Sequence, residues 1–234
     1  MAINGNEQDF TLTVDNICLT PATVSDSFTA ADTTLLQTFG YDTNGDQATV
    51  AIVNNRATVQ SSDVPLFLTP TVLQGGDLTL SAQLSADIGG AGGSSLALYL
   101  STKENLSDPI DGYGLRYQGD GITGSWQLVR YQGTNTTVLS QVSAGSNHPT
   151  TARFVELIRA GNTLTAKVDS TDIGLSYTES AGLSELIRYG LLGSGLTVAN
   201  GVYLDDLTLT YTTTATCPEI ASSGIWDERY PLYL

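Results

Sequence analysis

Basic residues are scarce in this sequence. The 234 residues include nine Lys or Arg against 24 Asp or Glu, which gives a formal net charge of -15 at pH 7. Charged residues together make up 14% of the chain, against roughly 25% in an average soluble domain. A surface this acidic repels phosphate backbones and anionic lipid headgroups, so we expect neither nucleic acid nor a membrane as a partner.

Long hydrophobic runs and targeting signals are missing as well. No apolar run approaches the roughly 20 residues that a membrane-spanning helix needs. The first residues contain neither a basic region nor an apolar one, so we expect no secretory signal and synthesis in a host cytoplasm. Hydrophobic residues still make up 41% of the chain, enough for a folded core.

Cysteine and histidine are nearly absent. Cys18 and Cys217 lie near opposite ends of the chain, and the single histidine, His148, has no catalytic Ser or Cys motif around it. We therefore expect no zinc site and no nucleophile paired with a base. Two alternatives stay open for the cysteines: they meet if the terminal strands are neighbours, or they remain free thiols in a reducing cytosol.

Hydrophobic and polar residues alternate with a period of two. Such alternation is typical of strands that bury one face in an antiparallel sheet. It occurs in runs 10–14, 50–59 (around an Asn54-Asn55 turn), 78–84, 96–100, 113–117, 126–131, 137–142, 155–159, 164–168 and 207–211. Helix is expected only as one or two turns within 30–37 and 179–186. The sequence predicts an all-β protein, an antiparallel two-sheet β-sandwich.

The chain divides into a central domain and two short arms. Residues 1–24 form an expected N-terminal arm with one strand and a break at Pro21. Residues 25–214 form the expected jelly-roll sandwich, and residues 215–234 lose the alternation and gain aromatic residues. About a dozen strands fit one sandwich better than two small domains.

Several segments, in order along the chain, resemble concanavalin A-like jelly-roll domains of lectins and glucanases, a module also found in phage virion and surface proteins. The first is Asp26–Leu36, which opens with Asp26-Ser27-Phe28, and it is followed by the Val50–Val59 hairpin with its Asn54-Asn55 turn. The chain departs from the pattern at Ala48-Thr49-Val50, where the family usually has a Trp. The other matching segments are Gly112–Tyr117, Trp126–Arg130, Arg159–Asp169 and Val202–Leu207.

The resemblance implies further expectations about a metal and about catalysis. Many such sandwiches hold a structural calcium ion between the first and last strands, where Asp26 and Asp205 stand in this sequence. Glycoside hydrolases with this architecture carry Glu-x-Asp-x-x-Glu on one strand, and no strand here has that pattern. We therefore expect a non-enzymatic protein, with no cofactor beyond that candidate calcium ion.

The 113–131 hairpin suggests where a sugar would bind. If Tyr117 and Trp126 close the hairpin loop, Trp126 lies on the core side and packs there instead of forming a binding platform. Arg116 and Gln127 then lie on the opposite, polar face and are the candidate sugar-binding residues. A slip of one residue in the pairing would exchange the two faces.

The C-terminal segment carries an unusual apolar cluster. Aromatic residues concentrate at the centres of protein interfaces, so the cluster either folds back onto its own sandwich or contacts a neighbouring subunit, and both alternatives stay open. Its members are Ile225, Trp226, Tyr230, Leu232, Tyr233 and Leu234.

Three hypotheses about function follow from these observations. The leading hypothesis is a phage structural protein at the virion surface. It would be a capsid decoration, cement or tail-associated protein that docks through its arms on the capsid lattice or other virion proteins and forms a homo-oligomer. The alternative is a lectin-like carbohydrate-binding adhesion module with a glycan as partner, and a glycoside hydrolase is the less favoured third.

Overall fold

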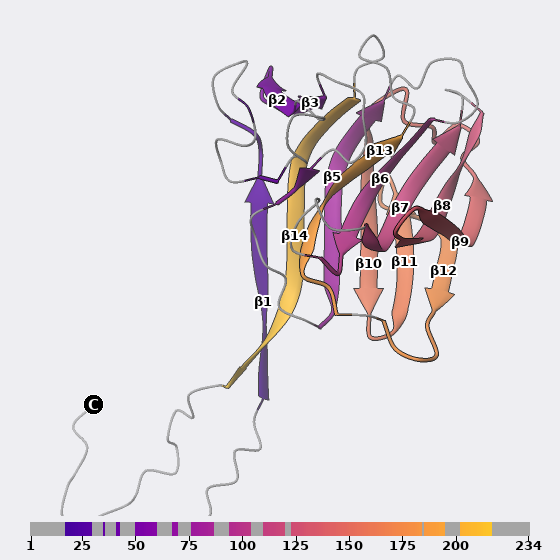
Figure 1. Cartoon of the computed structure of the whole chain (residues 1–234). Helices are drawn as coiled ribbons and strands as arrows, with labels where there is room; N and C mark the ends of the chain where they lie inside the picture. Colours follow the sequence, from indigo (N-terminus) through magenta and orange to yellow (C-terminus); the bar gives the residue numbers. More distant parts are fainter. Residues whose placement is uncertain are drawn as a thin grey trace, which may run out of the picture.

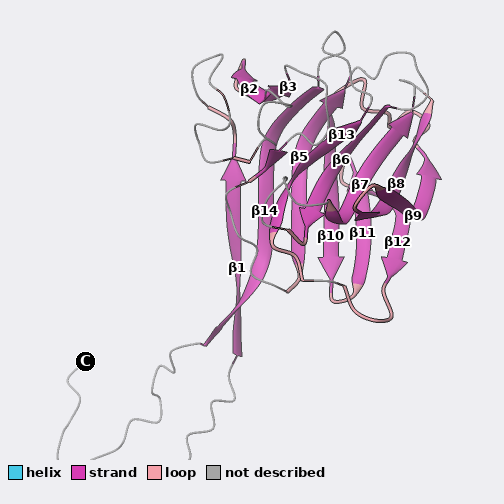
Figure 2. Cartoon of the chain, in the orientation of Figure 1, coloured by secondary structure: helices cyan, strands magenta, loops and turns pink. Residues whose placement is uncertain are grey.

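The computed structural model contains strands and connecting loops (Figure 2). It describes residues 17–29, 35, 41–42, 50–59, 67–69, 76–86, 94–103, 110–119, 123–183, 185–194 and 202–216. The strands form two sheets, one of eight strands and one of six. In this part of the chain no helix has the length and hydropathy needed to cross a membrane.

The eight-stranded sheet combines strands from both ends and the middle of the chain. Its strands are β1 (Ile17–Asp26), β2 (Val50–Val53), β3 (Arg56–Val59), β5 (Leu78–Ala86), β10 (Arg153–Ala160), β11 (Thr163–Val168), β12 (Thr171–Thr178) and β14 (Val202–Thr216). Their order across the sheet is β12-β11-β10-β5-β14-β3-β2, and β1 also pairs with β14.

The six-stranded sheet is built around a meander of four consecutive strands. Its strands are β4 (Phe67–Leu68), β6 (Ser94–Ser101), β7 (Asp111–Gly119), β8 (Gly124–Gln132), β9 (Asn135–Ser143) and β13 (Arg188–Ser194). Their order is β4-β13-β6-β7-β8-β9, and every pairing is antiparallel.

Strand β14 joins the terminal strand β1 to the body of the sandwich. One side of β14 pairs with β5 as far as Tyr211, and its other side pairs first with β3 and then with β1. Residues 213–216 therefore continue past the last pairing with β5 and pair with residues 17–20 of β1. Figure 1 shows this two-stranded ribbon extending beyond the other strands.

The core lies between the two sheets. Alternate side chains of each strand point into it, as the period-two pattern requires. Trp126 is 1% exposed, its ring meets that of Tyr117 at 5.2 Å in an edge-to-face arrangement, and its Nε1 donates to the Asn147 carbonyl at 2.9 Å. Because the indole N–H is satisfied, this large ring is buried without a desolvation penalty.

Two tight hairpin turns have the geometry that their sequences favour. Asn54 and Asn55, between β2 and β3, both have positive φ, and so do Asp169 and Ser170, between β11 and β12. Positive φ at both central positions defines the type I′ turn, which matches the twist of paired strands and favours Asn and Asp. The predicted Asn54-Asn55 hairpin is thus confirmed.

Four sequence-based expectations compare with the structure as follows. The helical turn expected within 179–186 is wrong, because Gly182 N–H donates to the Glu179 carbonyl in a tight turn and no helix forms among the described residues there. The 30–37 helix lies outside the described residues apart from Leu35, and so does the strand expected over 10–14. The break expected at Pro21 is wrong, because β1 continues through Pro21. Among the described strands β1 pairs with β14 alone, and proline is tolerated in such an edge strand.

Replacing Trp126 with Ala should lower the free energy of unfolding by about 3–5 kcal/mol, because a large buried ring is removed and a cavity is left. Urea denaturation measures this change. As a control, Val138→Ala alters a side chain on β9 that is 42% exposed, and it should change stability by about 0.5 kcal/mol or less. Equal effects of the two substitutions would show that Trp126 does not support the core.

Candidate functional site

The outer face of the six-stranded sheet carries two neighbouring rows of mainly polar side chains, which we call the polar rows. Strands β6 to β9 pair in register, so residues that lie opposite one another form straight rows across the sheet. The first row is Ser95, Gln118, Ser125 and Ser143. The second row, two residues earlier on β7, is Ala97, Arg116, Gln127 and Gln141.

Arg116 and Gln127 form the centre of a hydrogen-bond network. Nε and Nη2 of Arg116 donate to Oε1 of Gln127 at 3.0 and 2.6 Å. Nε2 of Gln127 donates to Oγ of Ser125 at 2.9 Å and reaches Oε1 of Gln141 at 3.5 Å. The network therefore ties β7, β8 and β9 together across the outer face.

The network holds the positively charged guanidinium of Arg116 in one orientation. Gln127 is 7% exposed and Arg116 is half-buried, and this burial lowers the pKa of Arg116. An arginine side chain still remains protonated under ordinary conditions. Nη1 of Arg116 has no hydrogen-bond partner in the described part of the chain, so it can donate to a ligand.

The two residues predicted for sugar binding are thus brought together on the outer face. Arg116 lies directly opposite Gln127, and Tyr117 lies opposite Trp126 with both rings in the core. The prediction that Trp126 packs in the core is confirmed. Gln141 was missed by sequence reasoning, although its place directly opposite Gln127 in the β8–β9 pairing follows once the hairpin register is known.

An aromatic cluster adjoins the polar rows on the same face. Its members are Ala97, Tyr99, Val129, Tyr131 and Leu192. The two tyrosine rings meet edge to face at 5.5 Å, and the Tyr99 hydroxyl donates to the Asp111 carbonyl at 2.7 Å. The second row therefore borders a buried apolar cluster.

Gly114 makes room for this cluster. A Cβ added at Gly114 would lie 3.0 Å from Cε2 of Tyr131 and 3.0 Å from the Leu98 carbonyl oxygen. Contacts that short are tighter than ordinary packing allows, so any larger residue would displace the ring. The glycine thus has a packing role beneath the aromatic cluster.

Asp26, one of the two candidate calcium ligands, has protein partners. Its carboxylate accepts hydrogen bonds from the Phe28 N–H at 2.7 Å and from the Tyr41 hydroxyl. Phe28 has a φ of 52° and is 1% exposed. The Asp-x-Phe segment therefore holds a sharp turn that inserts Phe28 into the core.

Asp205, the other candidate, has different partners. Its Oδ2 lies 3.5 Å from Nε of Arg56, and its Oδ1 accepts from the Asp206 N–H at 2.9 Å. Within the described ranges no three residues of the types His, Cys, Asp and Glu lie close enough together to hold a metal ion. The calcium site stays a prediction.

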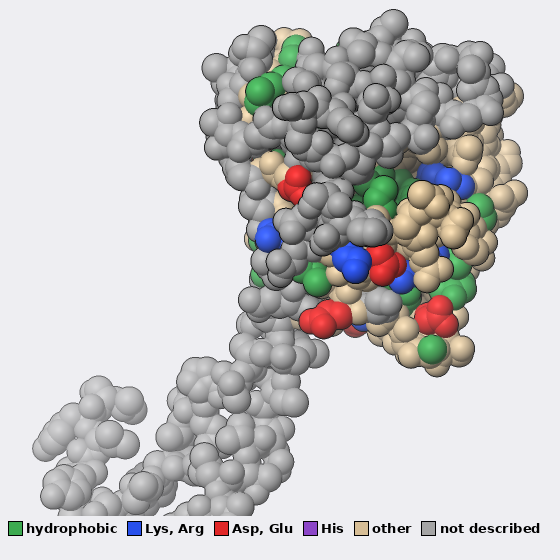
Figure 3. All heavy atoms as spheres, viewed as in Figure 1, with side chains coloured by type: hydrophobic (Ala, Val, Ile, Leu, Met, Phe, Trp, Pro, Cys, Tyr) green, Lys and Arg blue, Asp and Glu red, His purple; other side chains and the backbone are tan. Residues whose placement is uncertain are grey.

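Acidic side chains are spread over the described surface. On the face seen in Figure 3 they lie singly and are interspersed with Lys and Arg. Three of them form ion pairs on the sandwich: Asp111 with Arg130 at 2.6 Å, Asp169 with Arg153 at 2.8 Å, and Asp205 with Arg56 at 3.5 Å. The predicted interface cluster (Ile225, Trp226, Tyr230, Leu232, Tyr233 and Leu234) lies outside the described residues.

The aromatic cluster should make the protein sensitive to alkali. Burial raises the pKa of Tyr99 from 10.0 to about 12. Between these values the unfolded chain loses a proton that the folded chain keeps, so stability is full below pH 10 and falls as the pH rises toward 12. Tyr99→Phe should lower the melting temperature at pH 7, because it loses the bond to Asp111, yet flatten its decline above pH 10.

Scanning calorimetry across this pH range measures both effects. The control is Val138→Ala, which changes a 42% exposed side chain that has no titratable group and should leave the wild-type decline unchanged. An identical alkaline decline in wild type and Tyr99→Phe would contradict the role given to burial.

Comparison with known proteins identifies the fold. No family model and no curated protein matches the sequence. The carbohydrate recognition domain of Emp47p superposes with a TM-score of 0.58 at 12% identity over 82% of this chain and 95% of that one. A Bacillus subtilis protein with a galectin-like fold gives 0.56 at 8% identity, covering 85% and 100% of the chains.

A Bacillus licheniformis β-glucanase gives a TM-score of 0.51 at 14% identity over 82% of this chain and 98% of that one. Likenesses at such low identity show the fold. The predicted all-β fold class is confirmed, and the chain has the concanavalin A-like jelly-roll fold, an antiparallel two-sheet β-sandwich.

Proposed function

We propose that this protein is a lectin-like carbohydrate-binding module whose glycan site is the polar rows. The network centred on Gln127 carries the proposal, because it holds the Arg116 guanidinium in place with Nη1 available to a ligand. A glycan presents hydroxyl groups that both donate and accept hydrogen bonds. The amides and hydroxyls of the polar rows offer both kinds of group in a preformed arrangement, which reduces the entropic penalty of binding.

The side chains of the polar rows favour binding over cleavage. Glycoside cleavage requires two carboxyl groups on either side of the scissile bond, and the polar rows contain no Asp or Glu among their described members. One similar structure is named a carbohydrate recognition domain, so the fold is compatible with this ligand class. A non-enzymatic role is accordingly part of the proposal.

A glycan array probed with the full chain, with and without Ca²⁺, tests this function. We expect binding to at least one glycan class, and titration calorimetry with that glycan should show at least about tenfold weaker binding for Arg116→Ala. A hydrogen bond to a charged group contributes about 1.5–3 kcal/mol, and about 1.4 kcal/mol corresponds to a factor of ten. Gln127→Ala should weaken binding similarly, because it releases the guanidinium.

The matched control is Lys167→Ala, which removes one positive charge from β11 in the other sheet and should bind like wild type. Thermal unfolding of each variant verifies that the sandwich is intact. No binding to any glycan on the array, with or without Ca²⁺, would contradict a glycan site on the polar rows. Equal affinities of Arg116→Ala and Lys167→Ala for the glycan would contradict it as well.

A second candidate function is the capsid-decoration or tail-associated role at a virion surface. The ribbon formed by β1 and the end of β14 favours it, because residues 213–216 pair with β1 beyond the last pairing with β5. A ribbon of only two strands is marginally stable in water. Contact with a neighbouring subunit or another virion protein would stabilise it.

Light scattering of the purified full chain tests this second candidate. We expect the full chain to form particles of two or more copies, each copy contributing 24.6 kDa. A chain lacking residues 218–234 should form particles with fewer copies and should keep the same circular dichroism spectrum. A monomeric full chain would count against docking between copies. An unchanged number of copies per particle after the deletion would exclude the C-terminal cluster as the contact.

A further inference from the structure

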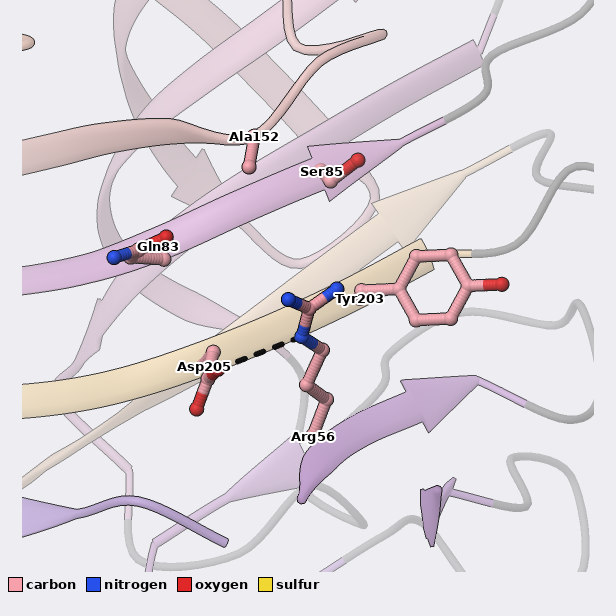
Figure 4. A pocket seen from close by; sticks show the side chains of 6 residues that line it. All are labelled: Arg56, Gln83, Ser85, Ala152, Tyr203 and Asp205. Carbon is pink, nitrogen blue, oxygen red and sulfur yellow. Dashed lines mark ion pairs between the residues drawn. The ribbon is translucent and has the colours of Figure 1, made fainter. Parts of the chain in front are cut away.

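The opposite sheet has a separate hollow on its outer face. It is a shallow, open depression where β3, β5 and β14 come together, and Figure 4 shows the side chains that line it. Its lining residues are Arg56, Gln83, Ser85, Ala152, Tyr203 and Asp205. None of them belongs to the polar rows, so the hollow is a distinct feature of the sandwich.

The pairing of β14 with its neighbours builds the hollow. Tyr203 lies opposite Ser85 on β5 and opposite Thr58 on β3, and Asp205 lies opposite Gln83. The β5–β14 register then shifts between Asp205 and Thr208, where Asp206 has a φ of 51°. Such a bulge bends a strand and re-aims its side chains.

The polar groups around the hollow are available to a ligand. Arg56 pairs with Asp205 through Nε at 3.5 Å, which leaves its two terminal nitrogens without a partner among the described residues. The side chains of Gln83, Ser85 and Tyr203 likewise form no hydrogen bond within the described ranges. Together these groups supply donors and acceptors on several sides of one small depression.

An aromatic ring completes the set. Tyr203 is 38% exposed and lies near the start of β14, so one face of its ring is open to solvent. Figure 4 shows its ring beside the Arg56 side chain, with Gln83 and Ser85 projecting from β5. A sugar ring has an apolar C–H face that packs on such a ring, while its hydroxyls bond to polar neighbours at the edge.

We propose that this hollow binds one neutral sugar residue, stacked on Tyr203 and hydrogen-bonded by Arg56, Asp205, Gln83 and Ser85. The balance of charge selects a neutral ligand, because Asp205 offsets Arg56 and would repel a carboxylate or sulfate. A metal ion is disfavoured because the hollow has a single carboxylate and a guanidinium beside it. With the polar rows on the other sheet, the chain would contact sugars on two opposite faces.

Nuclear magnetic resonance of the ¹⁵N-labelled full chain tests the hollow directly. The probes are the methyl glycosides of glucose, galactose, mannose and N-acetylglucosamine at millimolar concentration, with glucuronate as the anionic arm. We expect at least one glycoside to shift the backbone amides of Tyr203, Ser85 and Gln83 in a saturable manner, and glucuronate to shift them less. No shift with any of the four glycosides would overturn the proposal, as would shifts with glucuronate alone.

Variants separate this site from the polar rows. Tyr203→Ala should abolish the shifts at Ser85 and Gln83 over the same glycoside range, whereas Tyr203→Phe keeps the ring and should retain them. Arg116→Ala should leave them unchanged. Shifts that survive Tyr203→Ala would overturn the stacking site, and shifts confined to the polar rows would overturn the hollow while leaving the proposed function intact.

Discussion

The antiparallel register of β7 and β8 decides which side chains reach the outer face of the six-stranded sheet. With Tyr117 opposite Trp126, both rings enter the core and Arg116 meets Gln127 on the other side. A slip by one residue would turn Trp126 outward and turn Arg116 and Gln127 toward the core. The burial of Trp126 and the exposure of Arg116 therefore depend on one another, and the candidate site exists because the core packs in this register.

Both candidate sites are built on strands instead of loops. The polar rows are held by pairings of β6 to β9, and the hollow by pairings of β14 with β3 and β5. Side chains on paired strands lose little freedom when a ligand binds, which favours recognition by preformed groups. The two sites share one core, so the sandwich acts as a rigid spacer between opposite outer faces.

The sequence predicted the strands of the sandwich well where one face of a strand is buried and the other is exposed to solvent. It missed β13, where Tyr189, Leu191 and Leu192 are all buried and leave no alternation to detect. The polar pair on β7 and β8 was predictable because a hairpin fixes which residues are opposite. The hollow was not predictable, because it is formed by strands that are distant in sequence and by a bulge after Asp205 that no local sequence pattern indicates.

A crystal structure of the full chain with an oligosaccharide that it retains would test the central claim most directly. We expect the sugar on the outer face of the six-stranded sheet, with its hydroxyl oxygens within hydrogen-bond distance of Arg116 and its neighbours in the polar rows. An oligosaccharide bound elsewhere, with the polar rows solvated and unchanged, would contradict the assignment of this face as the principal glycan site.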